Sequence, residues 1–218
     1  MFERFENASG FLFDCDGTLL DTMKIWRQVE EELIDMAGGR IRDEDFIELQ
    51  AVCIEDGARL LHERYGAGSS ADELVGYVDR RLLGFYSDEV RAYDGAVEFV
   101  EKLRERDVVC GIVSSSPLRY LSAGLERCGL LGHMAAVVST EDAGCSKQEA
   151  RFYQLAAARM GASLETAWGM DDSLYAIEAM RASGLNTIGI YEDDKAGSFE
   201  RLAASADIAV RSFAELMV

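Results

Sequence analysis

Two aspartates one residue apart, Asp14 and Asp16, directly follow an apolar segment near the start of the chain. The apolar residues 11–13 are typical of a short buried strand, and Gly17 allows a tight turn just beyond it. Two carboxylates at the carboxyl end of a buried strand are costly to desolvate unless a cation or a proton compensates them. Because carboxylate oxygens are the ligands that hard divalent cations prefer, the pattern predicts a metal site, with Mg²⁺ as the natural ion.

Other polar residues follow later strands of the expected fold, and a lysine begins a later helix: Ser114 and Ser115, Asp171 and Asp172, and Lys147. Each has an ordinary interpretation when taken alone. The serines fit a loop and helix cap, the second aspartate of the pair fits a helix cap, and the lysine fits a solvated surface. In an open α/β sheet, however, ligands bind at the carboxyl ends of the strands. The order and strand placement of the whole set therefore favour one convergent site.

The elements that must position this site alternate between helix and strand from residue 93 onwards. We expect strands over residues 108–113, 135–138, 166–170, 186–190 and 207–210. We expect helices over residues 96–106, 118–128, 148–160, 174–182 and near 199–204. Such alternation predicts a Rossmann-like, doubly wound parallel sheet with helices on both faces.

The segment between the first strand and this alternating region has helical periodicity throughout. Helices are expected over residues 25–36, 43–52, 55–65 and 71–86, with no convincing strand between them. That is too long for a simple crossover, so it predicts an inserted all-α subdomain. We therefore expect an α/β core made of residues 1–22 and 92–218, and a helical cap made of residues 23–91.

The composition predicts which classes of partner the protein has and in which cellular compartment it lies. The chain has 218 residues, a formal net charge of −18 and a pI near 4.5, so we expect neither nucleic acid nor an anionic membrane as a partner. No apolar run is long enough to cross a bilayer and no signal-peptide layout is present, which predicts a cytoplasmic protein. Five cysteines without a CxxC pair are typical of reduced thiols. Nothing in the sequence requires more than a monomer.

The four clusters together resemble the motifs of the haloacid dehalogenase superfamily, in the subfamily with a helical cap after the first strand. Residues 14–18 read DCDGT and match the DxDGT first motif. Ser114 matches the end of the second motif, Lys147 the third-motif lysine, and Asp171 with Asp172 the acidic fourth motif. One departure follows the lysine, where relatives often have proline and this chain has Gln148. The resemblance covers essentially the whole chain.

This resemblance implies phosphate-ester chemistry. Asp14 is expected to attack phosphorus and form an aspartyl-phosphate. The side chain of Asp16 is expected to act as general acid and base, while its backbone carbonyl joins Asp14, Asp171 and Asp172 around Mg²⁺. Within this family the second aspartate of the first motif is absent from the haloacid dehalogenases and replaced in phosphonate hydrolases, so its presence here points to phosphate esters.

Ser114, Lys147 and nearby backbone N–H groups are expected to hold the transferring phosphoryl oxygens, with Gly17 and Ser115 among the phosphate-binding residues. The substrate is expected to be a small phosphorylated metabolite, which the cap selects. The sequence does not identify which one.

The main alternative is a sugar phosphomutase that resembles β-phosphoglucomutase. Those enzymes resemble this chain over residues 49–56, but they carry an arginine for a second phosphate where this chain has Ile54. They also carry a histidine on the first cap helix where this chain has Trp26, which fits either the pocket or the cap core. Losing a bidentate guanidinium favours hydrolysis over phosphoryl return, although Arg59 could partly substitute. A phosphate-binding protein without turnover is the third interpretation.

Overall fold

A computed structural model describes residues 2–49, 52–191 and 199–218. The chain divides into two compact units, Met1–Thr22 with Val90–Val218, called the core unit here, and Met23–Glu89, called the helical unit. The expected domain boundary at 91/92 remains a prediction, because compactness alone does not show that a unit folds independently.

The described part of the core unit contains a six-stranded parallel sheet in the order β3-β2-β1-β4-β5-β6, which confirms the predicted fold class. The strands are β1 (Gly10–Phe13), β2 (Val109–Ser114), β3 (Met134–Ser139), β4 (Trp168–Asp171), β5 (Asn186–Ile190) and β6 (Ile208–Val210). The helices are η1 (Phe2–Phe5), α5 (Ala96–Arg104), α6 (Leu118–Arg127), η2 (Leu131–His133), α7 (Thr140–Ala143), α8 (Ala150–Met160), α9 (Leu174–Ser183), α10 (Phe199–Ser205) and α11 (Phe213–Leu216).

Strand register brings the ends of the three central strands to one edge. Phe13, the last residue of β1, pairs with Ile112 of β2 and with Met170 of β4. Parallel strands aligned in this way end side by side, so the residues that follow them share the carboxyl edge of the sheet. This register is what places the predicted polar clusters near one another.

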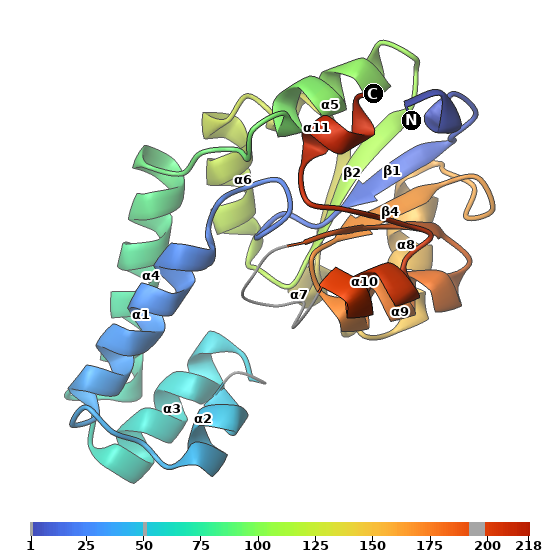
Figure 1. The fold of residues 1–218 in the computed structure, drawn as a ribbon. Coiled ribbons are helices and arrows are strands. Elements are labelled where there is room, and N and C mark those ends of the chain that lie inside the picture. The colour runs from blue at the N-terminus through green and yellow to red at the C-terminus, as the bar shows by residue number, and fades with distance from the viewer. Residues whose placement is uncertain (1, 50–51, 192–198) are drawn as a thin grey trace. The chain divides into compact units, whose positions relative to one another are not determined.

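The short strand β1 supplies side chains to both faces of the sheet, because successive residues of a strand alternate. Phe11 and Phe13 lie on the face covered by α5, where their rings are 5.6 Å and 6.2 Å from the ring of Phe99. Leu12 belongs instead to the buried cluster formed with α8, α9 and α10. Figure 1 shows α5 and α11 over one face of the sheet and α8, α9 and α10 over the other. Burial on both faces explains why β1 has no polar residue before Asp14.

Strand β5 approaches helix α10 so closely that a glycine is required. A Cβ placed on Gly189 would lie 2.6 Å from Cγ of Leu202 and 3.0 Å or less from both of its methyl groups. Leu202 is fully buried, so it has little room to retreat. The glycine therefore permits the layer of helices to pack against the sheet.

The helical unit contains α1 (Met23–Met36), α2 (Asp43–Leu49), α3 (Ile54–Tyr65) and α4 (Ala71–Asp88). Asp45 is almost completely buried there and accepts hydrogen bonds from Arg42, Arg64 and Tyr65. These bonds, with those of Arg42 and Tyr65 the largest, lower the pKa of Asp45 to about 2. They also join the start of α2 to the end of α3, which stabilises the pairing of two short helices.

The expected elements differ from the structure mainly at their ends. The helix expected over residues 148–160 begins at Ala150, and the one expected over 43–52 ends at Leu49, with residues 50 and 51 outside the described part. The sequence did not predict η1, η2, α7 or α11. Each spans four residues or fewer, which is too short for a hydrophobic period to be recognised.

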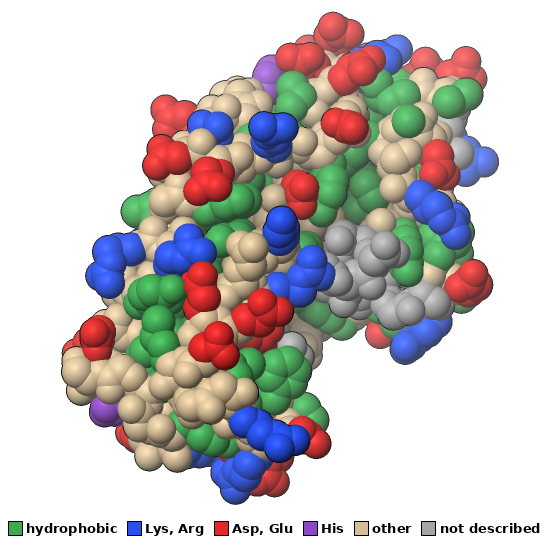
Figure 2. Space-filling view, turned by 60° about the vertical axis from the view of Figure 1, so that its left-hand side comes forward, with side chains coloured by type: hydrophobic (Ala, Val, Ile, Leu, Met, Phe, Trp, Pro, Cys, Tyr) green, Lys and Arg blue, Asp and Glu red, His purple; other side chains and the backbone are tan. Residues whose placement is uncertain are grey.

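The surface charges, the helix hydropathy and the cysteines of the described residues can be read directly from the structure. Lys and Arg side chains on the face shown in Figure 2 are scattered among Asp and Glu instead of forming one continuous patch. Within the described ranges, no helix combines the length and apolar character needed to cross a bilayer. All five cysteines are free thiols, with Cys15 and Cys110 buried.

We predict that Gly189→Ala destabilises the core unit by about 1–3 kcal/mol, because the added methyl group overpacks the contact with Leu202. Gly132→Ala is the matched control, since a Cβ there meets no described atom within 4 Å, and its effect should stay within about 0.5 kcal/mol. Urea unfolding of both variants measures the difference. Equal stability of the two would show that Leu202 can move aside.

Candidate active site

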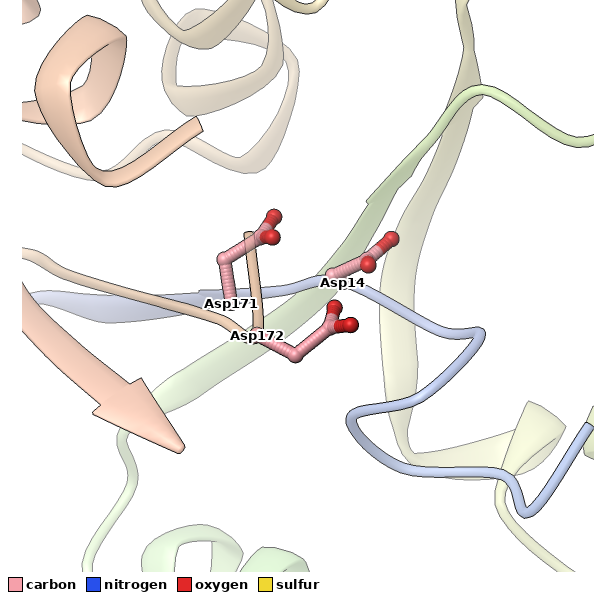
Figure 3. Close-up of side chains that lie close together, drawn as sticks. All are labelled: Asp14, Asp171 and Asp172. Carbon is pink, nitrogen blue, oxygen red and sulfur yellow. The ribbon is translucent and has the colours of Figure 1, made fainter. Parts of the chain in front are cut away.

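Three buried aspartates gather where β1 and β4 end. One carboxylate oxygen each from Asp14, Asp171 and Asp172 lie within 4.8 Å of one another, and all three residues are buried. Figure 3 shows their side chains grouped at this edge of the sheet. The backbone N–H of Asp14 also donates to the carbonyl of Met170 at 2.8 Å, which fixes the end of β1 against β4. This backbone hydrogen bond therefore holds Asp14 beside the aspartates at the end of β4.

Lys147 brings a buried positive charge into this cluster. Its Nζ lies 2.7 Å from Oδ1 of Asp14 and 2.7 Å from Oδ2 of Asp171, although its side chain is only 5% exposed. Burial by itself lowers the pKa of Lys147, but Asp14 and Asp171 more than compensate, so the pKa is raised well above its usual value. The lysine is therefore a fixed cation. The phenol of buried Tyr153 donates to the backbone carbonyl of Lys147 at 2.8 Å and anchors the loop that carries it.

The cluster still has more negative charge than its lysine can neutralise. Burial raises the pKa of Asp171, and although Lys147 opposes this, Asp14 adds to it. One ammonium group faces three carboxylates within this small volume. An excess of buried carboxylate oxygens is the donor set that a hard divalent cation prefers, so the residues present fit such an ion.

The loop after β1 is closed by backbone hydrogen bonds. The carbonyl of Cys15 accepts from the N–H groups of Leu19 and Leu20, and Gly17 has φ of +83°, which favours glycine. Thr18 lies inside this loop, and its hydroxyl donates to Oδ1 of Asp172 at 3.4 Å. The loop thus links the end of β1 to the aspartates after β4.

The carboxylate of Asp16 has hydrogen-bond partners of its own, apart from the three grouped aspartates. Its Oδ1 accepts from the hydroxyl of Thr22 at 2.8 Å, and its Oδ2 accepts from the hydroxyl of Ser116 at 2.6 Å. Its carboxylate is not a member of the three-carboxylate group found among the described residues. The two aspartates of the first motif therefore occupy separate environments.

The serines after β2 also differ from one another. Ser114 is buried at the end of β2, and its Oγ accepts from the backbone N–H of Ser116 at 3.1 Å. A hydroxyl that accepts in this way keeps its own proton for donation. Ser115 is exposed, and its carbonyl accepts from Thr140 at 3.5 Å. The structure thus places Ser114 at the edge where Asp14 and Asp171 lie.

Four residues that contact the site were not singled out by sequence reasoning: Thr18, Thr22, Ser116 and Tyr153. Thr18 and Thr22 stand in or beside the first motif, so their position was a usable signal. Ser116 was visible only as part of a serine run that also fits a helix cap. No feature of the sequence indicated a role for Tyr153, because an aromatic residue on a helix usually packs in the core.

The candidate residues of the predicted cap all belong to the helical unit. Trp26 donates through Nε1 to the hydroxyl of Tyr86 at 3.0 Å. Arg59 is exposed and pairs with Asp56 at 2.9 Å, and Ile54 begins α3. Within residues 49–56, the stretch that resembles the mutases, Gln50 and Ala51 lie outside the described residues. The roles of these residues toward a substrate remain predictions.

Comparisons with known proteins agree with the motifs. Hexitol phosphatase B of Escherichia coli K12 is 26% identical over 179 residues, which cover 81% of each chain. Pyrophosphatase PpaX of Listeria monocytogenes serotype 4a (strain HCC23) is 25% identical over 181 residues, which cover 82% of this chain and 81% of that protein. The crystal structure of CbbY from Rhodobacter sphaeroides in complex with phosphate shares the fold, with a TM-score of 0.76, 19% identity and 96% of each chain covered.

The family match covers most of the chain. The model of the haloacid dehalogenase-like hydrolases matches residues 8–184, a range that contains every predicted site residue. This confirms the family resemblance, and the two curated relatives compared above are phosphatases by name. The family match and these relatives together identify an enzyme, a hydrolase consistent with a phosphatase. The chain belongs to the haloacid dehalogenase-like hydrolase family.

Proposed function

We propose that this protein is a Mg²⁺-dependent phosphatase that hydrolyses a small phosphomonoester through an aspartyl-phosphate on Asp14. The observation that carries the proposal is the buried Lys147 ammonium group, which lies 2.7 Å from both Asp14 and Asp171. A buried lysine held by two strand-end aspartates is costly unless the site uses its charge. A phosphoryl group brings the anionic oxygens that such a charge would bind.

In the first step, an oxygen of Asp14 attacks phosphorus and the bond to the ester oxygen breaks. The bonding electrons go to that leaving oxygen, which takes a proton from the carboxyl group of Asp16. Lys147 and the hydroxyl of Ser114 donate to the phosphoryl oxygens, with backbone N–H groups near Gly17 and Ser115 as further donors. Their positive charge and dipoles offset the repulsion between a carboxylate and a phosphate dianion.

In the second step, Asp16 accepts a proton from water, which attacks phosphorus and releases Asp14 and orthophosphate. One residue can serve both steps because the second proton transfer is the reverse of the first. Asp14, Asp171 and Asp172, with the backbone carbonyl of Asp16, would hold Mg²⁺. The ion, when bound, supplies charge neutralisation for the phosphoryl group and aligns it with the nucleophile.

Hydrolysis is favoured over mutase chemistry by the helical unit. A mutase must hold a second phosphate while the intermediate is turned around, which a bidentate guanidinium does well. Ile54 stands where β-phosphoglucomutases carry that arginine, and Arg59 is already paired with Asp56. The names of the two curated relatives, hexitol phosphatase and pyrophosphatase, support a small phosphorylated substrate.

We predict that Asp14→Asn lowers kcat on 4-nitrophenyl phosphate by more than about 10³-fold, because an amide cannot serve as the nucleophile. Asp107→Asn is the matched control. Asp107 is exposed just before β2, at the opposite edge of the sheet from the site, and should keep full activity. Orthophosphate release with Mg²⁺ measures both. Activity retained in Asp14→Asn would exclude Asp14 as the nucleophile.

We predict that Mg²⁺ raises the Tm of the wild-type protein, because the ion relieves repulsion among three buried carboxylates. The gain in folding free energy is about 2.7 kcal/mol at a hundredfold excess of Mg²⁺ over its Kd. Asp172→Asn removes one ligand and should abolish most of this shift. A thermal scan with and without a chelator reads binding without any substrate. A shift of equal size in Asp172→Asn would place the ion elsewhere.

A product analysis separates the phosphatase from the mutase. With a hexose 1-phosphate and a trace of hexose bisphosphate primer, we expect orthophosphate and no hexose 6-phosphate beyond the amount that hydrolysis of the primer can release, because the second-phosphate clamp is missing. Phosphorus NMR distinguishes the two products directly. Accumulation of the 6-phosphate faster than orthophosphate would make the mutase the correct interpretation.

A further inference from the structure

Ser116 contacts both halves of the proposed machinery. Its hydroxyl donates to Oδ2 of Asp16 at 2.6 Å, and its backbone N–H donates to Oγ of Ser114 at 3.1 Å. Ser116 is 8% exposed and Asp16 is 6% exposed, so both bonds are sheltered from water. Ser116 is therefore the residue that connects the expected acid–base group to the expected phosphate-binding hydroxyl.

The bond to Asp16 is short and charge-assisted, which is the strong class of hydrogen bond. Asp16 has a second anchor, because the hydroxyl of Thr22 donates to its other oxygen at 2.8 Å. With one donor on each oxygen, the plane of the carboxylate is fixed. Loss of the Ser116 donor would loosen the restraint on the last torsion of Asp16, which is broad for aspartate.

We propose that Ser116 is a positioning residue for acid–base catalysis by Asp16. The inference rests on the proposed role of Asp16 and adds a residue that neither the family match nor the motif comparison assigns. Ser116 orients the Asp16 carboxyl group, while its backbone N–H occupies a lone pair of Ser114 and leaves that hydroxyl proton available for a phosphoryl oxygen.

This role has a consequence that depends on the leaving group. As the bond from phosphorus to the ester oxygen breaks, its electron pair stays on that oxygen, and the proton from Asp16 neutralises it. An alcohol or a weakly acidic phenol leaves poorly without this proton, whereas 4-nitrophenolate is stable as an anion and needs it little. A misoriented acid therefore slows esters of poor leaving groups selectively.

The test measures kcat/KM of Ser116→Ala on aryl phosphates of increasing leaving-group pKa, namely 4-nitrophenyl, phenyl and 4-methoxyphenyl phosphate. We expect a loss of about tenfold or more on 4-methoxyphenyl phosphate and little change on 4-nitrophenyl phosphate, since general acid catalysis is needed only for the former. The plot of log(kcat/KM) against leaving-group pKa therefore becomes steeper. Ser116→Thr keeps the hydroxyl and should restore the wild-type slope.

Two further variants separate positioning from structure. Ser183→Ala deletes another buried serine hydroxyl, which donates to the carbonyl of Met180 on α9, and should leave the slope unchanged. In an Asp16→Asn background, Ser116→Ala should have no additional effect on any ester, because the group that it positions is already lost. A uniform loss on all three esters, or an undiminished loss in the Asp16→Asn background, would overturn the proposal.

A crystal structure of Ser116→Ala gives a readout that does not depend on turnover. We expect the Asp16 carboxylate to leave the position that it has in the wild-type protein. An unchanged position of the carboxylate in this variant would refute the positioning role even if the enzyme is a phosphatase. If the wild-type protein hydrolyses neither these three esters nor any phosphomonoester of a broad panel, the proposed function fails, and the position of Asp16 in the crystal still decides this inference.

Discussion

Lys147 reaches Asp14 and Asp171 from a loop far along the chain, and the buried ammonium group lies between two carboxylates that end different strands. Removing either kind of partner would leave an uncompensated charge inside the protein, which costs far more than an exposed ion pair is worth. The loop before α8 and the ends of β1 and β4 are thus bound to one another by charge. The remaining features of the site can be understood as supports for this contact.

The sheet supplies the first of these supports. Parallel register aligns the ends of β1, β2 and β4, so aspartates and a serine that are distant in sequence share one edge. Close packing and hydrogen bonding then support that edge, because Gly189 lets α10 approach the sheet and the Tyr153 hydroxyl donates to the backbone carbonyl of Lys147. A site built on strand ends and helix starts can hold its groups more precisely than one built on loops alone.

A second feature of the site is that Asp14 and Asp16, the two aspartates of the first motif, have different partners. Asp14 joins the carboxylates that contact Lys147, while Asp16 is held by Thr22 and Ser116. Two carboxyl groups in one environment would compete for the same cation. In different environments they can take different roles, and this is the usual way in which one site provides both a nucleophile and an acid.

The fold class, the strand–helix alternation and the four motif clusters could be predicted from the amino-acid sequence, because hydrophobic period and strand-end polarity are local properties. Short elements such as α11 escaped prediction, since four residues cannot display a period. The contacts of Lys147 with Asp14 and Asp171, and that of Ser116 with Asp16, became visible in the folded chain. Those contacts join residues far apart in the chain, so they depend on the strand order, which the periodicity of a single segment does not specify. The roles of the predicted site residues stay a prediction, and the fold shows which partners those residues have.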